Sequence, residues 1–467
     1  MKDMKRRLET YSFFDRTGIE AHLTSMAAKG WMIEKLTNFG WIYRRTKARQ
    51  LTFCVTYYPD ASDFDPAPSE KQNTFYAFCE HAGWTLAASS AQMQIFYTDQ
   101  AHPVPIETDP ELEVENIHRS AKKGFLRSYF LLFIVTLLNG GLFLYTLGSD
   151  PVWLLSSNTN LFTGSCWLIL LLLCAAELGS YFSWRLKAQK AAKRGEFLVY
   201  KSTRRLQRIA LYYVLSGGLC WLIGKFMSGS PLQSFLAVMI VLYMVFIFFF
   251  VNFLKEALKK RKTPAKANQF LSVLSCFILG FTFMSVLTFA TLQASSQGWF
   301  AGKNSTYNYH GTTFTIYLDE LPLTVEDLLP VEYDGYIRRR TSDESFMLGQ
   351  FEMEQEARLD AKHFGDMPGL RYTITEVRLS FLYDLCKNAL LRKQNITRNL
   401  RIPEGHKSLY QPADAAPWNA LEAYQLFDQD TGARNRYLLC YEKRIIEIDF
   451  DWTPTLEQMA VTAKKLA

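Results

Sequence analysis

The sequence predicts a polytopic α-helical membrane protein with five spans, a small α+β domain before them and an α+β domain after them. A spanning helix needs about 20 mostly apolar residues, and five segments qualify, at roughly residues 128–147, 161–184, 209–227, 232–254 and 269–292. Charge is also partitioned: there are 12 basic and 16 acidic residues in 1–117, 20 and 4 in 118–292, and 20 and 25 in 293–467. A basic excess confined to the apolar region is typical of a membrane segment with basic flanks and argues against a nucleic-acid-binding domain.

The distribution of Lys and Arg between the spans predicts the orientation of the chain. The connections before span one, between spans two and three, and between spans four and five are rich in basic residues. The connections 148–160 and 228–231 contain none. By the positive-inside rule, residues 1–117 form a cytoplasmic domain, residues 118–292 a transmembrane region of the plasma membrane, and residues 293–467 an extracytoplasmic domain. Met1–Phe14 is charged throughout, so we expect the first span to serve as an uncleaved targeting signal.

The N-terminal domain contains a sequence repeat of the form helix–strand–strand. Capping-box patterns, T-x-x-E at Thr17 and S-x-x-Q at Ser69, predict the starts of the two helices. Gly30 and Gly83 end them, and each glycine is followed by two strand patterns. A further strand over residues 51–57 links the two halves. We therefore expect a small α+β sandwich with its helices on one face of an antiparallel sheet.

Three carboxylates, Asp60, Asp63 and Asp65, lie in the linker between the two halves. They lack the glycine and the terminal glutamate of an EF-hand loop, and the turn preferences of Asp, Ser and Pro explain them without a metal. No metal site and no cofactor is predicted.

Several stretches of this domain resemble a known family. They are Met26–Lys35, Tyr57–Ser62, Ala82–Trp84 and Met93–Tyr97. They are similar to an uncharacterised "domain of unknown function" family of bacterial membrane proteins, found mainly in Gram-positive lineages, over about residues 8–115. Members are often encoded beside a PadR-like transcriptional regulator, which implies a regulated envelope or stress role. The family has no established activity, so the resemblance assigns no catalytic residues.

Two ionisable residues lie clearly inside predicted spans, Glu177 in the second and Lys225 in the third. Such residues are costly in the bilayer and are functional-site hypotheses by default. Because they fall in opposite halves of the bilayer, we do not expect them to pair. Each is either a functional group or a side chain accommodated by the bundle interior or the interface.

The C-terminal region has patterns of both helix and strand. A strand is predicted over 370–377, a helix over 380–391, a hairpin over 436–450, and a final amphipathic helix capped at Thr455. Cys386 and Cys440 share this compartment, where a disulfide is permitted, but they fit equally well as free core thiols.

The sequence contains no H-E-x-x-H, G-x-S-x-G, P-loop or G-x-G-x-x-G motif, so we do not predict an enzyme. The arrangement favours a regulatory or signalling protein that links an outer domain to a cytoplasmic one. The alternative is a transporter or a transporter-accessory protein.

The expected partners are the lipid bilayer and a protein bound by the N-terminal domain or by the basic connections. These connections either only fix the topology or also bind anionic lipid headgroups. The oligomeric state stays open.

Overall fold

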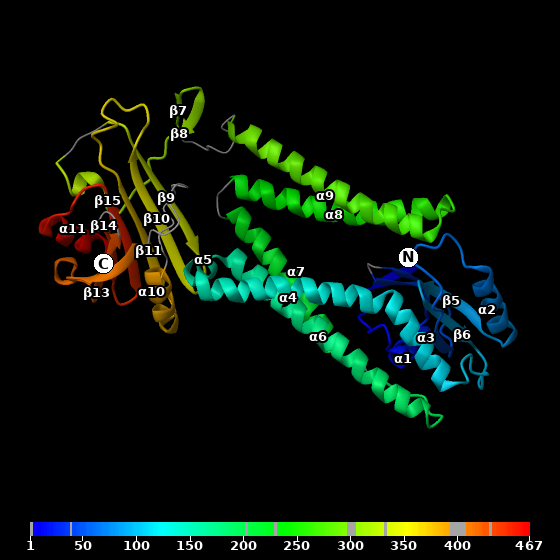
Figure 1. Cartoon of the computed structure of the whole chain (residues 1–467). Coiled ribbons are helices and arrows are strands. Elements are labelled where there is room, and N and C mark those ends of the chain that lie inside the picture. Colours follow the sequence, from blue (N-terminus) through cyan, green and yellow to red (C-terminus); the bar gives the residue numbers. More distant parts are fainter. Residues whose placement is uncertain are drawn as a thin grey trace. The chain divides into compact units, whose positions relative to one another are not determined.

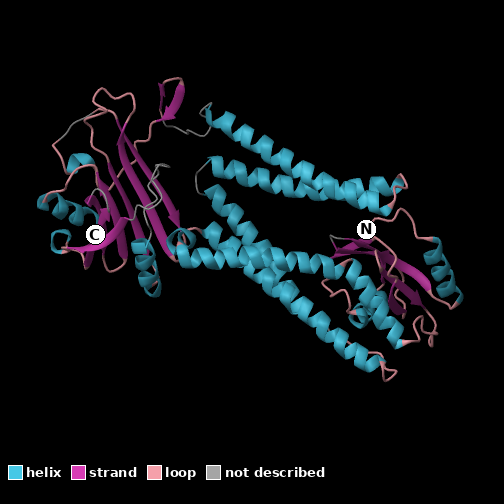
Figure 2. Ribbon diagram, in the orientation of Figure 1, coloured by secondary structure: helices cyan, strands magenta, loops and turns pink. Residues whose placement is uncertain are grey.

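The computed structural model describes residues 3–37, 40–200, 204–227, 231–296, 305–330, 334–392, 408–428 and 432–467. Strands lie toward both ends of the chain and long helices between them (Figure 1, Figure 2). Two compact units can be separated. The first comprises Met1–Leu138, Cys166–Met227 and Gln233–Thr288, and the second Asn139–Ser165, Ser228–Leu232 and Phe289–Ala467.

The N-terminal region contains two copies of a strand–helix–strand–strand unit. The first copy is β1 (Met4–Arg7), α1 (Arg16–Ala28), β2 (Trp31–Thr37) and β3 (Gly40–Arg45). The second is β4 (Thr52–Tyr57), α2 (Glu70–His81), β5 (Thr85–Ser90) and β6 (Met93–Thr98). The strand orders are equivalent, β1-β3-β2 and β4-β6-β5, and all neighbours are antiparallel.

A β-bulge interrupts both copies at the equivalent point, between Ile33 and Lys35 and between Leu86 and Ala88. The shared bulge and strand order confirm the repeat and extend it by one element. Strand β4 is therefore the first strand of the second copy, with β1 as its counterpart. The strands form two three-stranded sheets, so the expectation of a single sheet is wrong.

The first helix does not start as the capping box predicted. The N-cap of α1 is Asp15, whose carboxylate accepts a hydrogen bond from the Gly18 amide at 3.0 Å. The Thr17 hydroxyl instead donates to the carbonyl of Tyr200 at 2.9 Å. The second helix begins as predicted, because the Ser69 hydroxyl accepts from the Gln72 amide at 3.2 Å.

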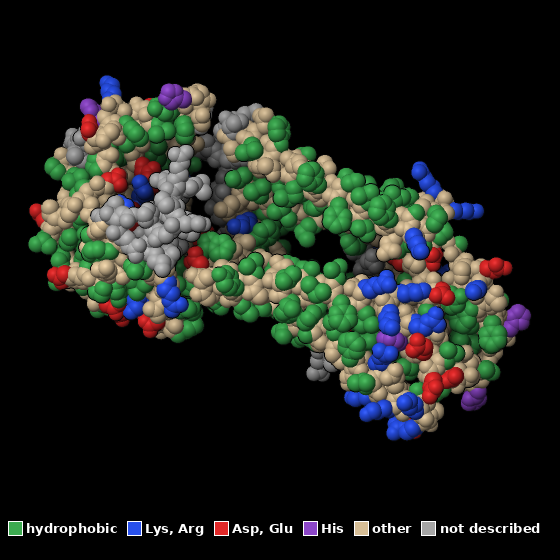
Figure 3. Space-filling view, in the orientation of Figure 1, with side chains coloured by type: hydrophobic (Ala, Val, Ile, Leu, Met, Phe, Trp, Pro, Cys, Tyr) green, Lys and Arg blue, Asp and Glu red, His purple; other side chains and the backbone are tan. Residues whose placement is uncertain are grey.

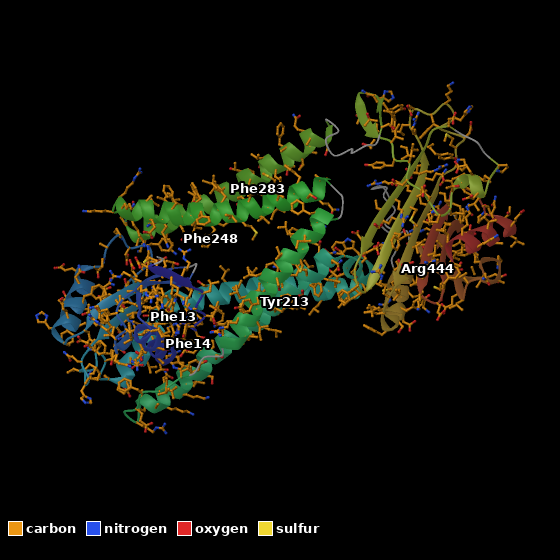
Figure 4. All side chains as sticks on the ribbon, turned by 180° about the vertical axis from the view of Figure 1, so that it is seen from behind. Phe13, Phe14, Tyr213, Phe248, Phe283 and Arg444 are labelled. Atoms are coloured by element: carbon orange, nitrogen blue, oxygen red, sulfur yellow. The ribbon has the colours of Figure 1, made fainter. Side chains whose placement is uncertain are left out.

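Among the described residues, five helices are long and apolar enough to cross a membrane. They are α4 (Phe125–Ser149), α6 (Asn158–Ala192), α7 (Arg204–Met227), α8 (Pro231–Lys260) and α9 (Ala265–Ser296). Each predicted span lies inside one of them, which fits a polytopic helical membrane protein. Helices α8 and α9 pack through Tyr243 and Phe283, whose rings stack with centroids 4.0 Å apart. Phe283 is labelled in Figure 4.

Two shorter helices, α3 (Pro110–Lys123) and α5 (Pro151–Ser156), were not predicted. Both start with Asp-Pro. The Asp109 carboxylate accepts from the Glu111 amide at 2.8 Å, and the Asp150 carboxylate from the Trp153 amide at 3.3 Å. An Asp N-cap followed by Pro at the first helical position is a strong start signal, because Pro lacks the amide that would otherwise need a partner.

The C-terminal region is built on a seven-stranded antiparallel sheet of order β12-β13-β14-β15-β11-β10-β9. Its strands are β9 (Tyr336–Glu344), β10 (Leu348–Ala357), β11 (Leu370–Val377), β12 (Ser408–Ala413), β13 (Glu422–Asp428), β14 (Gly432–Cys440) and β15 (Arg444–Phe450). The other elements are the hairpin β7 (Thr306–Tyr309) and β8 (Thr312–Thr315), and the helices α10 (Tyr383–Arg392) and α11 (Leu456–Leu466). The predicted strand over 370–377, the hairpin and the two helices are therefore confirmed.

Both faces of this sheet are covered. Leu438 and Cys440 belong to a core with α5 and α10, while their neighbour Leu439 belongs to a second core with α11, as strand alternation requires. Helix α11 begins with the capping box predicted at Thr455. Arg444, labelled in Figure 4, connects the C-terminal end of α11 to the sheet. Its guanidinium pairs with Glu376 at 2.8 Å and donates to the Ala467 carbonyl at 3.2 Å.

Cys386 and Cys440 are both buried, free thiols in this core. The side of α10 that faces the sheet is formed by Cys386 and Leu390, together with Leu382 just before the helix. Leu385, next to Cys386 in the same helix, is 39% exposed.

The two helix-ending glycines provide a matched pair for a test of the repeat. Gly30 and Gly83 have positive φ, +78° and +83°, so an alanine at either position is strained by about 1–2 kcal/mol. A Cβ on Gly30 would also lie 2.8 Å from the backbone oxygen of Thr46, whereas one on Gly83 would meet only the flexible side chain of Gln100. We expect Gly30→Ala to speed hydrogen exchange in α1 and β2 of the full-length protein more than Gly83→Ala does in α2 and β5. An equal or larger effect of Gly83→Ala would contradict this.

Candidate functional site

The hydrophobic core of the N-terminal domain continues into the adjacent membrane helices. Phe14, in the β1–α1 loop, contacts Tyr181 and Trp184 of α6 with ring centroids 5.4 and 5.3 Å apart (Figure 4). Phe125 of α4 lies 5.9 Å from Phe13 and 6.1 Å from Phe14. These residues pack in one cluster with the domain's own core residues. The domain and these helix ends therefore share a single core.

Glu177, predicted as an intramembrane functional residue, lies beside this core. Its side chain belongs to α6, and the residue is only 3% exposed. The Ser12 hydroxyl donates to one carboxylate oxygen at 2.9 Å, and the Gln207 amide of α7 donates to the other at 2.5 Å. Glu177 thus joins three segments that are far apart in the sequence: the β1–α1 loop, α6 and α7.

Lys225, the second predicted residue, has a different environment. It is partly buried near the end of α7, and its ammonium group donates to the Gln233 side chain of α8 at 3.0 Å. The Ser234 hydroxyl donates to the Lys225 carbonyl at 3.0 Å. Glu177 and Lys225 therefore have separate partners, and Lys225 contributes to the contact between α7 and α8.

A second loop of the N-terminal domain, between β4 and α2, binds the α8–α9 hairpin. Asp63 pairs with Lys255 at 2.6 Å and lies 3.9 Å from Lys259, both on α8. Asn268 of α9 donates to the Phe64 carbonyl at 3.3 Å. The Asp65 carboxylate accepts from the Ser62 amide at 2.7 Å, as turn chemistry predicts.

The third carboxylate of this loop, Asp60, pairs with Lys123 of α3 at 2.9 Å. Two of the three linker carboxylates thus form ion pairs with helices, Asp60 with α3 and Asp63 with α8. Figure 3 shows that Lys and Arg side chains gather over the N-terminal domain and the helix ends beside it, on the face drawn.

A buried cluster of charges holds α3 against the domain. Arg16 of α1 pairs with Glu113 of α3 at 2.8 Å, and Glu20 and Glu107 lie 3.7 and 3.9 Å away. Glu20 also accepts from the Val55 amide at 2.9 Å, and Glu107 from the Thr56 hydroxyl at 2.7 Å, so both contact β4. Three carboxylates share one guanidinium here.

This excess of buried carboxylates changes their acidity. Burial raises the pKa of Glu113 from its ordinary value of 4.5 to about 7; Arg16 opposes this rise, while Glu107 and Glu20 add to it. Burial also raises the pKa of Glu20 and of Glu107. Since α3 leads directly into α4, the protonation of this cluster bears on how the domain is attached to the first membrane helix.

Sequence reasoning identified Glu177 but missed its partners Ser12 and Gln207, and it missed the Arg16–Glu113 cluster. The Asp-Pro start of α3 was a usable signal for this helix, and Glu113 lies on its buried side between apolar positions. No local pattern marks Ser12, because its partner is 165 residues away.

Residues 15–130 match a family described as "Protein of unknown function (DUF2812)". This confirms the resemblance to a domain of unknown function and covers α1 to the first turns of α4, including Arg16, Glu113 and Phe125. Comparison with curated proteins and with solved structures gives no match.

The Glu177 contacts predict a local effect of mutation. Glu177→Leu removes the acceptor of the buried Ser12 hydroxyl and the nearer acceptor of the partly buried Gln207 amide, which costs about 1–3 kcal/mol. We expect amides around Ser12 and at the start of α7 to exchange hydrogen roughly 10-fold faster, while Glu177→Gln, which still offers an acceptor, stays close to wild type. Glu196→Leu, which removes an exposed carboxylate just after α6, is the control. Unchanged exchange in Glu177→Leu would show that these contacts do not hold the loop.

The carboxylate cluster predicts a pH dependence. Because the folded pKa of Glu113 lies above its unfolded value, its proton stabilises the folded domain at low pH, and this stability is lost as pH rises from about 4.5 to about 7. The loss is on the order of 3 kcal/mol. Thermal unfolding of the full-length protein, followed by tryptophan fluorescence, should show this decline. Glu113→Gln should flatten it, and Glu111→Gln on the exposed side of α3 should not. The same decline in Glu113→Gln would rule Glu113 out as its source.

Proposed function

We propose that this is a regulatory membrane protein of the plasma membrane, in which α6 carries a conformational state between an extracytoplasmic C-terminal domain and a cytoplasmic N-terminal domain. The observation that carries the proposal is that α6 is hydrogen-bonded to the C-terminal domain where it begins and to the N-terminal domain toward its other end. The PadR-like neighbour implied by the family resemblance fits a regulated role.

The C-terminal domain binds the start of α6 and the short helix before it. The Asn158 side chain, in the first turn of α6, donates to the Glu344 carbonyl of β9 at 2.9 Å. The Ser345 hydroxyl donates to the Leu155 carbonyl of α5 at 2.5 Å. Val152 and Leu155 of α5 are 1% and 5% exposed and belong to the core beneath α10. These contacts make α5 part of the C-terminal domain.

The later part of α6 belongs to the core of the N-terminal domain through Glu177, Tyr181 and Trp184. Helix α6 has 35 residues and no proline. At 1.5 Å per residue it is about 50 Å long, more than the roughly 30 Å of a bilayer core. A shift of Asn158 along the helix axis would therefore be passed to Glu177, because the intervening backbone hydrogen bonds resist compression.

The distribution of contacts supports the proposed topology. The C-terminal domain contacts the connection between the first and second membrane helices. The N-terminal domain contacts the later part of α6, the start of α7, and the ends of α8 and α9 next to their connection. If all five helices span the membrane, these two sets of connections lie on opposite sides of it. The second set is the basic one, which the positive-inside rule assigns to the cytoplasm.

Transport, or an accessory role in transport, is the alternative. It predicts that Glu177→Gln changes solute accumulation at an unchanged protein level. The hydrogen bonds of Glu177 to Ser12 and Gln207 favour a role in connecting the N-terminal domain to α6 and α7. We therefore keep signalling as the proposed function.

The proposal is tested by perturbing α5 and observing the N-terminal domain. Leu155→Asp puts a charge into the core beneath α10, whereas Trp153→Asp alters the same short helix at a position that is 53% exposed. We expect Leu155→Asp, in full-length protein in lipid nanodiscs, to speed hydrogen exchange several-fold around Ser12 and in α3, and Trp153→Asp to leave it unchanged. Faster exchange confined to the C-terminal domain would contradict transmission through α6.

A further inference from the structure

A cavity of about 570 Å³ lies between the N-terminal domain and α8. Its walls come from the end of β2, the β5–β6 turn, the β4–α2 loop and one side of α8. Four basic side chains line it: Arg6, Lys35, Lys255 and Lys259.

Two of these cations are placed side by side by the register of the first sheet. Arg6 of β1 and Lys35 of β2 both pair with Ile42 of the central strand β3. Directly paired residues point to the same face, so Arg6 and Lys35 share a face two strand spacings, or about 10 Å, apart. Both are exposed, and within the described residues neither forms an ion pair.

The other two cations lie one helical turn apart on α8. Lys255 pairs with Asp63, and Lys259 lies 3.3 Å from Glu256 and 3.9 Å from Asp63. Asp65 is engaged by the Ser62 amide. The three carboxylates that line the cavity thus have partners from its own walls, whereas Arg6 and Lys35 pair with no carboxylate among the described residues and are available to an anionic ligand.

The position of the cavity along α8 indicates the source of that ligand. The apolar run of α8 ends at Leu254, and the cavity wall extends from Phe249, inside this run, to Lys259, beyond it. This wall therefore crosses from the hydrocarbon layer into the headgroup layer. We propose that the cavity binds the phosphate-bearing headgroup of an anionic phospholipid, with the phosphate near Arg6 and Lys35 and the acyl chains along α8. The site is independent of signal transmission through α6.

Binding is measured on full-length protein in a neutral detergent with short-chain lipids. Dioctanoyl phosphatidylglycerol is the probe, dioctanoyl phosphatidylcholine the neutral comparison, and inorganic phosphate the soluble competitor. Arg6→Gln with Lys35→Gln removes two cavity cations. Lys47→Gln with Arg49→Gln removes two exposed cations of the same domain that do not line the cavity.

We expect the cavity double variant to bind phosphatidylglycerol roughly 10- to 30-fold more weakly than wild type, because each Lys or Arg near an anionic lipid changes the binding constant about five-fold. The control double variant should stay within two-fold of wild type, phosphatidylcholine should bind more weakly than phosphatidylglycerol, and millimolar phosphate should not displace the lipid. Equal weakening in both double variants would overturn the site in favour of general surface charge. Displacement by phosphate would overturn a lipid occupant in favour of a soluble anion.

Discussion

The hydrocarbon core of a bilayer offers no hydrogen-bond partner, so a polar side chain within a span must find its partners in the protein. Glu177 meets this requirement by accepting from Ser12 and Gln207. The β1–α1 loop is thereby placed against α6 and α7, and Phe14 of the same loop reaches the rings of Tyr181 and Trp184. The shared core, the placement of α3 beside it and the proposed transmission along α6 all depend on this junction.

The internal duplication explains why the N-terminal domain attaches to two separate groups of helices. In each copy the attachment is made by the loop between the first strand and the helix. The loop of the first copy holds Ser12 and Phe14 and binds α4, α6 and α7. The equivalent loop of the second copy holds Asp63 and Phe64 and binds α8 and α9. The first attachment is largely buried and combines aromatic packing with the hydrogen bonds of Glu177, whereas the second rests on an ion pair whose Asp63 side chain is 44% exposed. The two should therefore respond differently to salt and to lipid charge.

Much of the fold can be predicted from local sequence patterns, whereas the contacts around Glu177 cannot. The lengths of the apolar runs predict the five long helices. The two helix-ending glycines, each followed by two strand patterns, predict the repeat. The capping box at Thr17 failed because a tertiary contact, with Tyr200, competes for its hydroxyl, while Asp15 caps the helix. Helix α5 has only six residues, too few for a periodic pattern, although Asp150-Pro151 marks its start. Glu177 could be identified from the sequence because an ionisable side chain inside a span is energetically unfavourable. Its partners could not, because they depend on a fold that brings residue 12 to residue 177.

The most direct test of the account is the side of the membrane on which each domain lies. Lys47→Cys in the N-terminal domain and Lys362→Cys in the C-terminal domain place a single exposed thiol on each, in a chain whose eight native cysteines are replaced. A membrane-impermeant maleimide is applied to intact and to permeabilised cells. The account predicts that Lys362→Cys is labelled in intact cells and Lys47→Cys only after permeabilisation. Labelling of both only after permeabilisation would place the two domains on the same side and contradict transmission across the membrane.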